Sequence, residues 1–201
     1  MDHSDSAQVQ AEQKKLSATV LWLNEKYRDI SLSGGTREHI AYACLDTALE
    51  HQMAIELLGR ASLYGSMHAL LRSLFEAFIR GSWFARCATD DEIEYFRRKD
   101  DIKKGFGTLV KEVETALGHQ EAVLTNIKLK SWDAMNSFTH TGVAQLSRRS
   151  GANALELAFP ERDIISVLRA AGSMGLLAAM EMATIAGLED LARETLTQAK
   201  S

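Results

Sequence analysis

The near absence of proline is the sequence feature that most constrains this fold, because the chain has one proline in 201 residues. Proline interrupts a helix, since it lacks the backbone N–H and clashes with the preceding turn. Apolar residues recur three and four positions apart, and no segment keeps the two-residue alternation of a strand. We therefore predict an all-α fold, a single-domain helical bundle of about four to five long helices with shorter connecting helices.

Apolar spacing and end signals divide the chain into about eight helical segments. We expect them at residues 8–27, 36–58, 62–87, 89–98, 106–117, 120–146, 160–186 and 188–199. Thr36 is expected to cap the second segment, Thr89 and Glu92 form a capping box, and Pro160 suits a first helical position. The expected domain spans residues 1–201, with a flexible tail at 1–7, a core at about 8–187 and a terminal helix at 188–199.

Composition and charge exclude several classes of protein. Lys and Arg number 23 against 27 Asp and Glu, a net charge of −4, which is too nearly balanced for the whole protein to bind polyanions. The first ten residues lack the basic start and apolar core of a secretory signal, and no uncharged apolar run is long enough to span a membrane. Cys44 and Cys87 are expected as free thiols. We expect a cytoplasmic protein.

The histidines and acids show no metal-binding pattern, because the sequence has neither a Glu-x-x-His pair nor a His-x-x-x-His spacing. We therefore expect no metal and no other cofactor. Between Arg97 and Arg149, however, ten basic residues face six acidic ones. This region is expected to present a surface toward anions.

A polar row on the third helix is the most informative pattern. His68, Arg72, Glu76 and Arg80 follow one another at steps of four, and on a helical wheel His68 and Arg72 fall within the apolar arc. A charge that faces a core needs a partner, because an unpaired buried ion is costly. The row is therefore either a structural Arg–Glu pair that locks two helices together or a small polar pocket for an anion such as phosphate. His68 is open to the same alternatives, a core histidine or a ligand-binding one.

A second group of polar residues lies near the end of the 120–146 segment. His140 stands at the border of the apolar face, and Asn136 and Ser137 provide hydrogen-bonding neighbours. A histidine held in this way suits proton transfer near neutral pH, whereas the alternative is a buried histidine bonded to a neighbouring helix. Gly142 indicates either a close approach or a kink in the helix. Arg148 follows at the helix end, where the helix dipole favours a cation.

These two segments resemble a known family. The pattern Arg72-x-x-x-Glu76-x-x-x-Arg80-Gly-x-Trp, with Ser137-x-x-His140-x-Gly later, is similar to that of uncharacterised all-helical bacterial proteins distantly similar to HEPN domains. The resemblance covers about residues 51–149. It implies a helical bundle of a kind that often dimerises and that includes metal-independent RNases of toxin–antitoxin and phage-defence systems.

The chain departs from the nuclease pattern at one point. Nuclease-active HEPN domains carry an arginine separated from the histidine by four to six residues on the same helix. Before His140 the corresponding positions hold Asp133, Ala134 and Met135. If His140 is catalytic, the resemblance implies that its cation comes from Arg72, Arg80 or Arg148.

The sequence leaves three functions open. The first is a HEPN-like nucleic-acid- or nucleotide-handling defence or stress protein with metal-independent RNase chemistry, in which His140 moves a proton, Arg72 stabilises negative charge and Glu76 assists. The second is a non-catalytic dimerising or partner-binding module, and the third is a small-molecule-binding sensor. The expected binding residues are His68, Arg80, Asn136, Ser137 and Arg148. The expected partners are a second copy of the chain and RNA or a nucleotide, with no membrane and no metal.

Overall fold

The computed structural model describes residues 6–118, 121–149 and 158–199. Over these ranges the chain is all-α, with nine α-helices, one short 3-10 helix and no strand. The helices are α1 (Ala7–Tyr27), α2 (Thr36–Arg60), α3 (Tyr64–Arg86), α4 (Asp90–Lys99), α5 (Phe106–Ala116), α6 (Val123–Thr139), α7 (Val143–Leu146), α8 (Glu161–Ile185) and α9 (Glu189–Gln198), and the 3-10 helix η1 (Ser147–Arg149) follows α7.

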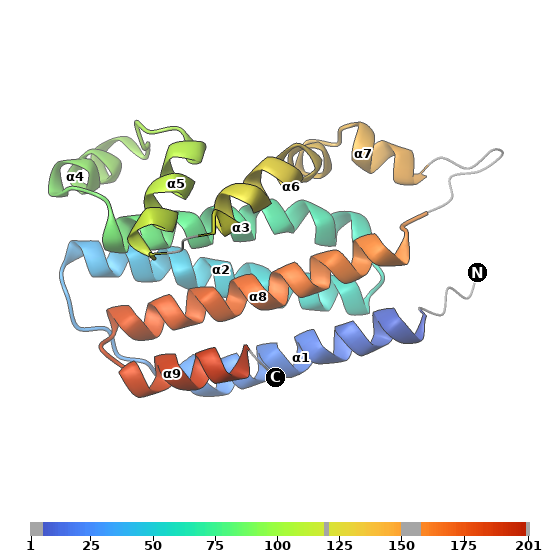
Figure 1. Ribbon diagram of the computed structural model, residues 1–201, viewed down its shortest axis with the longest axis horizontal. Helices are drawn as coiled ribbons and strands as arrows, with labels where there is room; N and C mark the ends of the chain where they lie inside the picture. Colours follow the sequence, from blue (N-terminus) through green and yellow to red (C-terminus); the bar gives the residue numbers. More distant parts are fainter. Residues whose placement is uncertain (1–5, 119–120, 150–157, 200–201) are drawn as a thin grey trace.

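Four long helices, α1, α2, α3 and α8, run side by side (Figure 1). Helix α2 packs against α3 and α8, and α8 also contacts α1, α3 and α9. Helices α4 to α7 lie over α3, on the side away from α1 and α9 (Figure 1). This second layer is what brings the end of α6 to the polar row of α3.

Helix α3 supplies the largest fully buried side chains among the described residues. Its apolar residues follow the helical period, and the side chains of Phe75, Phe78, Trp83 and Phe84 are almost completely buried. Gly81 lets α2 approach closely, because a Cβ at this position would lie 2.6 Å from Cγ of Leu45. Because most of α3 is buried, its polar side chains reach solvent only at positions that no other helix covers.

Helix α8 is long and apolar enough to cross a membrane by length and composition. In this fold it packs against four other helices, as the core helix of a bundle does. A close approach occurs at Gly175, where a Cβ would lie 2.1 Å from the side-chain amide of Gln52 on α2. Small residues on α8 therefore allow α2 to pack near its backbone.

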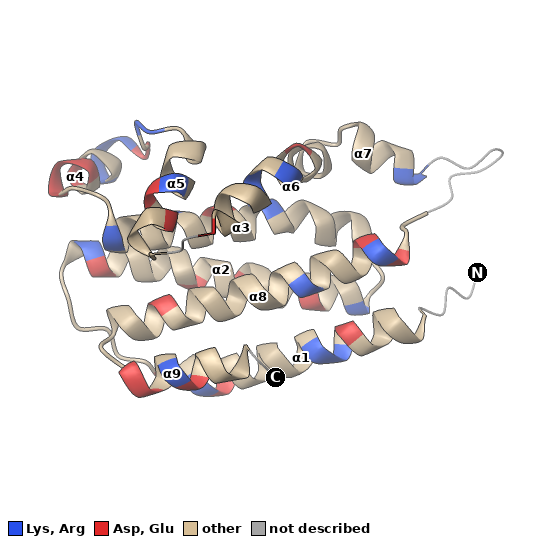
Figure 2. Cartoon of the chain, in the orientation of Figure 1, with Lys and Arg blue, Asp and Glu red and all other residues tan. Residues whose placement is uncertain are grey.

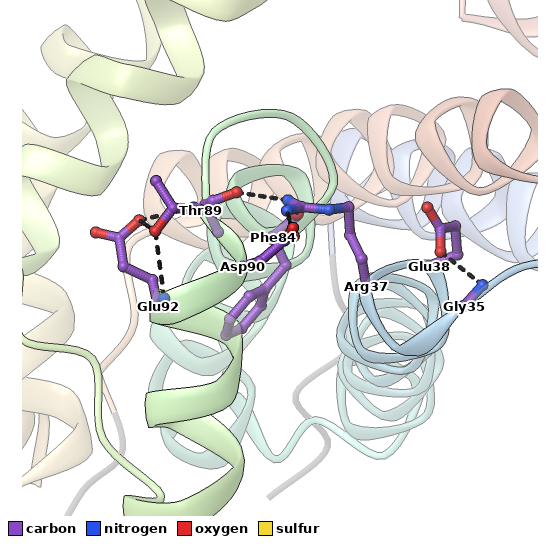
Figure 3. Close-up of polar contacts among 8 residues, drawn as sticks. Gly35, Arg37, Glu38, Phe84, Thr89, Asp90 and Glu92 are labelled. Atoms are coloured by element: carbon purple, nitrogen blue, oxygen red, sulfur yellow. Dashed lines mark hydrogen bonds and ion pairs between the residues drawn. The ribbon is translucent and has the colours of Figure 1, made fainter.

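The beginnings of α2 and α4 are stabilised by neighbouring side chains, as Figure 3 shows. The Glu38 carboxylate accepts the Gly35 N–H at 2.8 Å, and Glu92 and Thr89 form the capping box expected from the sequence. Arg37 donates to the backbone oxygen of Phe84 at 3.0 Å and pairs with the Asp90 carboxylate. This guanidinium joins the start of α2 to the end of α3.

Helix α6 is anchored at its first turn by a buried carboxylate of α5. Glu114 accepts the N–H groups of Leu124 at 2.6 Å and of Thr125 at 3.3 Å, and also the Thr125 hydroxyl. The open N–H groups of a helix start need such acceptors, and a negative charge there also suits the helix dipole. Further along, the ring of Trp132 stacks on that of Phe106, with centroids 4.6 Å apart. Together these contacts fix α6 over α3.

Most of the expected helix boundaries lie within about two residues of the observed ones. Two end signals are corrected: Gly35 rather than Thr36 is the N-cap of α2, and Pro160 is the N-cap of α8 rather than its first residue. The expected helix over 120–146 is wrong, since α6 ends at Thr139 and α7 begins at Val143. The expected segments leave positions 147–159 outside any long helix, and the structure has η1 at their start. Positions 150–157 lie outside the described residues, as do positions 1–5 of the expected tail.

Candidate functional site

The site is centred on one contact between α3 and the end of α6. Nη1 of Arg72 lies 2.7 Å from Nε2 of His140, and the contact is exposed to solvent. A guanidinium has only N–H donors, so Nε2 must be the acceptor. The contact therefore requires a neutral imidazole whose proton is on Nδ1.

Glu76 holds the other edge of the same guanidinium. Nε and Nη2 of Arg72 both donate to Oε1 of Glu76, at 3.1 and 2.9 Å. The pair is formed at the i and i+4 positions of α3, and both side chains are only partly exposed. Three of the five N–H groups of Arg72 are used by Glu76 and His140, and within the described part of the chain the other two have no protein acceptor. These two donors are available to a ligand.

An aromatic ring supports the guanidinium. Cζ of Arg72 lies 5.0 Å from the ring centroid of Trp132, within the range of a cation–π contact. Nζ of Lys128, one turn earlier on α6, lies 5.7 Å from the same centroid. The site thus combines two cations, one carboxylate and one imidazole over an aromatic surface.

A tight turn places His140 at this position. His140 is the C-cap of α6, and the next residue, Thr141, has a left-handed conformation with φ of 55°. The N–H of Gly142 then donates to the Ser137 carbonyl oxygen at 2.6 Å, as at a helix end closed by a left-handed residue. Ser137 Oγ also accepts the Ala144 N–H at 2.9 Å.

Gly142 is required by this turn rather than by a continuous helix. A Cβ at this position would lie 2.6 Å from Oγ of Ser137 and 3.1 Å from its Cα. Just before the turn, the Thr139 hydroxyl lies 3.1 Å from the Ala69 carbonyl oxygen on α3. The imidazole is therefore presented next to α3 by a turn whose residues are tied to both helices.

His68 lies in the core rather than beside Arg72. Its Nδ1 donates to the Tyr64 carbonyl oxygen at 2.7 Å, and its ring packs against those of Phe138 and Phe159 at centroid distances of 4.6 and 5.2 Å. Burial lowers the pKa of His68, more than the Tyr64 hydrogen bond raises it. This arrangement is that of a neutral core histidine.

The remaining predicted residues take separate places. Arg80 is exposed two turns after Arg72, and Arg148 forms an ion pair with Asp163 of α8 at 2.6 Å. Oδ1 of Asn136 and Nε of Arg148 are buried and have no protein hydrogen-bond partner among the described residues. Of the three cations considered for His140, the structure brings Arg72 to it.

Trp132 and Lys128 are not among the site residues that the sequence analysis named. Their spacing of four residues on one helix is the signal that links them, because it puts a cation one turn from an aromatic ring. In the described ranges, no group of three or more His, Cys, Asp or Glu side chains is placed to hold a metal ion.

The fold and the site together define the class of protein. It is all-helical and carries an exposed arginine–histidine pair where two helices meet. The chain belongs to the DUF6988 family, a family of unknown function whose model matches residues 45–201. The match includes both helices that build the site. No curated protein and no solved structure matches the chain.

Proposed function

We propose that this protein is a HEPN-like RNA-handling protein that cleaves RNA without a metal ion, with His140 and Arg72 as its catalytic pair. The observation that carries the proposal is the 2.7 Å contact between Arg72 Nη1 and His140 Nε2 on an exposed surface. The arginine absent from α6 is supplied by α3. Glu76 acts as the positioning residue, because it holds two N–H groups of the guanidinium.

The reaction uses the two groups in different roles. The scissile phosphate accepts the free N–H groups of Arg72, and as Nη1 turns to a phosphate oxygen, Nε2 of His140 is released. Nε2 then takes the proton of the 2′-hydroxyl, whose oxygen attacks the adjacent phosphorus. The bond from phosphorus to the 5′-oxygen breaks, water protonates that oxygen, and His140 returns its proton to solvent. The guanidinium stabilises the charge that develops on the phosphorane oxygens.

The charge distribution supports an anionic substrate. Lys and Arg residues lie on α6 and just after α7, in η1 (Figure 2). They belong to the region from Arg97 to Arg149, where ten basic residues face six acidic ones. Lys130 and Arg149 are exposed there, on the same layer of helices as the site. A negatively charged backbone would be attracted to this layer although the whole chain has a net charge of −4.

Cleavage of a single-stranded RNA in the presence of EDTA tests the proposal. The wild type is expected to produce fragments that end in a 2′,3′-cyclic phosphate and to leave the all-deoxy version of the substrate intact. His140→Ala should lower the rate by about 10² to 10⁴, the usual contribution of a positioned acid or base. The matched control is His39→Ala, since His39 is an exposed histidine on α2, far along the chain from the site.

Three results distinguish a catalytic Arg72–His140 pair from a purely structural one. Arg72→Gln should abolish most of the cleavage while the protein remains folded, since the side chain is partly exposed. Absence of RNA cleavage by the purified wild type would overturn the proposal. Equal rates for the wild type and His140→Ala would overturn it as well.

A non-catalytic dimerising module is the second candidate, and it is favoured by exposed apolar side chains on α6 and α7. Leu129 is 73% exposed, Val143 is 81% exposed, and Leu146 follows on the same segment. Val143 and Leu146 are three positions apart on α7, and neighbouring exposed apolar side chains favour an interface. Leu129→Glu combined with Val143→Glu should convert a dimer to a monomer in light-scattering measurements, and a monomeric wild type would contradict this candidate.

A further inference from the structure

Two cations flank the Arg72–His140 pair without a carboxylate partner of their own. Lys128 on α6 lies near the ring of Trp132, and Arg149 in η1 lies near the start of α3. In the ranges that the structure describes, neither side chain forms an ion pair or a hydrogen bond. Both positive charges are therefore available to an anion, and the proposed reaction steps use neither of them.

The antiparallel arrangement of α3 and α6 determines on which side of the pair each cation lies (Figure 1). The ring of Phe138, near the end of α6, packs on that of His68, near the start of α3, with centroids 4.6 Å apart. Trp132, earlier on α6, contacts Arg72, later on α3. The early residues of α6 therefore lie beyond Arg72, whereas the chain after α6 lies toward the start of α3.

Lys128 lies next to Arg72 on the side of the early residues of α6. Nζ of Lys128 is 5.7 Å and Cζ of Arg72 is 5.0 Å from the centroid of the Trp132 ring, so both cations contact one ring. Like charges in such proximity repel each other, and an anion that contacts both removes the repulsion. Gly107 of α5 leaves room for the lysine, because an added Cβ would lie 3.3 Å from its Cε.

Arg149 lies on the other side of the pair. A Cβ added at Gly65 would lie 3.3 Å from Nη2 of Arg149, so this guanidinium lies against the first turn of α3. Gly65 precedes Arg72 by seven residues, about two helical turns, so both positions are on one face of α3 and about 10 Å apart. The charges of a nucleic-acid strand follow one another about every 3.4 Å when it is stacked and further apart when it is extended, so this distance covers at most about three nucleotides. The order along the junction of α3 and α6 is Lys128, Arg72, Arg149.

We propose that a single-stranded RNA lies along this junction, with its scissile phosphate at Arg72 and phosphates on either side of it bound by Lys128 and Arg149. The inference rests on the proposed function, because it takes Arg72 as the group that binds the reacting phosphate. A single strand is required because the 2′-oxygen must come in line with the 5′-oxygen, which the regular geometry of a duplex prevents. Contacts of this kind hold the backbone and do not read the bases. The substrate is then a strand of at least about four nucleotides rather than a free nucleotide.

Binding of a fluorescein-labelled 2′-O-methyl hexauridylate to the full chain tests the inference, because this strand has no 2′-hydroxyl and cannot be cleaved. Lys128→Gln combined with Arg149→Gln should raise the dissociation constant at least about tenfold in fluorescence anisotropy. The slope of log Kd against log salt should fall by about 1.4, the value for two phosphate contacts of a single strand.

The matched control, Lys14→Gln with Arg28→Gln, removes the same two charges from exposed positions on and just after α1, and should change the dissociation constant less than about twofold. An unchanged constant in Lys128→Gln/Arg149→Gln, or an equal change in both double variants, would overturn the inference. Absence of binding by the wild type would overturn it as well.

Cleavage of two substrates separates this inference from the proposed function. The dinucleoside monophosphate UpU has the scissile phosphate alone, so Lys128→Gln/Arg149→Gln should lose about tenfold more kcat/KM on hexauridylate than on UpU. Equal losses on the two substrates would indicate damage to the reacting pair and would contradict the flanking contacts. If the wild type cleaves neither substrate, the RNase proposal fails, and the binding measurement still decides whether Lys128 and Arg149 hold the strand.

Discussion

Replacement of Gly142 by alanine tests the turn that presents His140. The backbone φ of Gly142 is −81°, which alanine adopts without strain, so the effect should come from contact alone. The added Cβ would lie 2.6 Å from Oγ of Ser137, and 3.1 and 3.2 Å from its Cα and carbonyl oxygen. Because two of these three atoms are backbone, the turn must move. Overpacking of this kind costs about 1–3 kcal/mol of unfolding free energy.

Urea unfolding measures this cost, and Gly172→Ala is the matched control. Gly172 lies inside α8, where the added Cβ would meet only a Leu16 methyl at 3.8 Å, so this variant should gain about 0.5–1 kcal/mol of stability. The two alanine variants should therefore shift the unfolding midpoint in opposite directions at an unchanged m value. A Gly142→Ala protein within about 0.5 kcal/mol of the wild type would refute the reasoning about the turn.

A double-mutant cycle tests whether the side chain of Ser137 causes the loss of stability in Gly142→Ala. Ser137→Ala alone removes the bond to the Ala144 N–H and should cost about 0.5–1.5 kcal/mol. In the Ser137→Ala/Gly142→Ala protein the shortest contact is gone, so the combined loss should be smaller than the sum of the single losses by about 1 kcal/mol. Additive losses would show that the side chain of Ser137 is not the obstacle.

Three further predictions concern buried polar groups. Burial lowers the pKa of His68 in the folded protein, so the unfolded chain binds the proton more readily and the unfolding free energy should fall as the pH drops below about 6.5; urea midpoints should show a smaller fall in His68→Phe. Arg86→Met leaves the 3% exposed carboxylate of Glu181 without its 2.7 Å partner and should cost about 3–5 kcal/mol in thermal or urea unfolding, much of it regained in Arg86→Met/Glu181→Leu. Glu114→Ala removes the acceptor for the first turn of α6 and should cost about 1–3 kcal/mol, with faster hydrogen exchange in α6 than elsewhere.

The helical fold could be predicted because its determinants are local. The apolar period of α3 and the capping box of α4 each depend on residues within a few positions of one another. The break between α6 and α7 could not be predicted in this way. It depends on Thr141 in a left-handed conformation, which threonine seldom adopts, and Gly142 also fits a helical pattern with a kink.

The site could be predicted only in part, because its central contact joins residues 68 positions apart. The wheel position of Arg72 showed that it needed a partner, and Glu76 followed from the i, i+4 spacing. The sequence alone did not show which of Arg72, Arg80 and Arg148 lies next to His140. Each step of four residues turns the row by about 40°, so Arg80 is rotated about 80° from Arg72 and faces solvent. Arg148 pairs instead with Asp163 of α8.

The protonation state of the His140 ring tests most directly whether Arg72 and His140 form one site. Side-chain ¹H–¹⁵N correlation spectra distinguish a proton on Nδ1 from one on Nε2 in the neutral imidazole. Because the Arg72 guanidinium donates to Nε2, the proton should be on Nδ1 in the wild type and should redistribute toward Nε2 in Arg72→Met. A wild-type ring with its proton on Nε2, or a spectrum unaffected by Arg72→Met, would contradict the account.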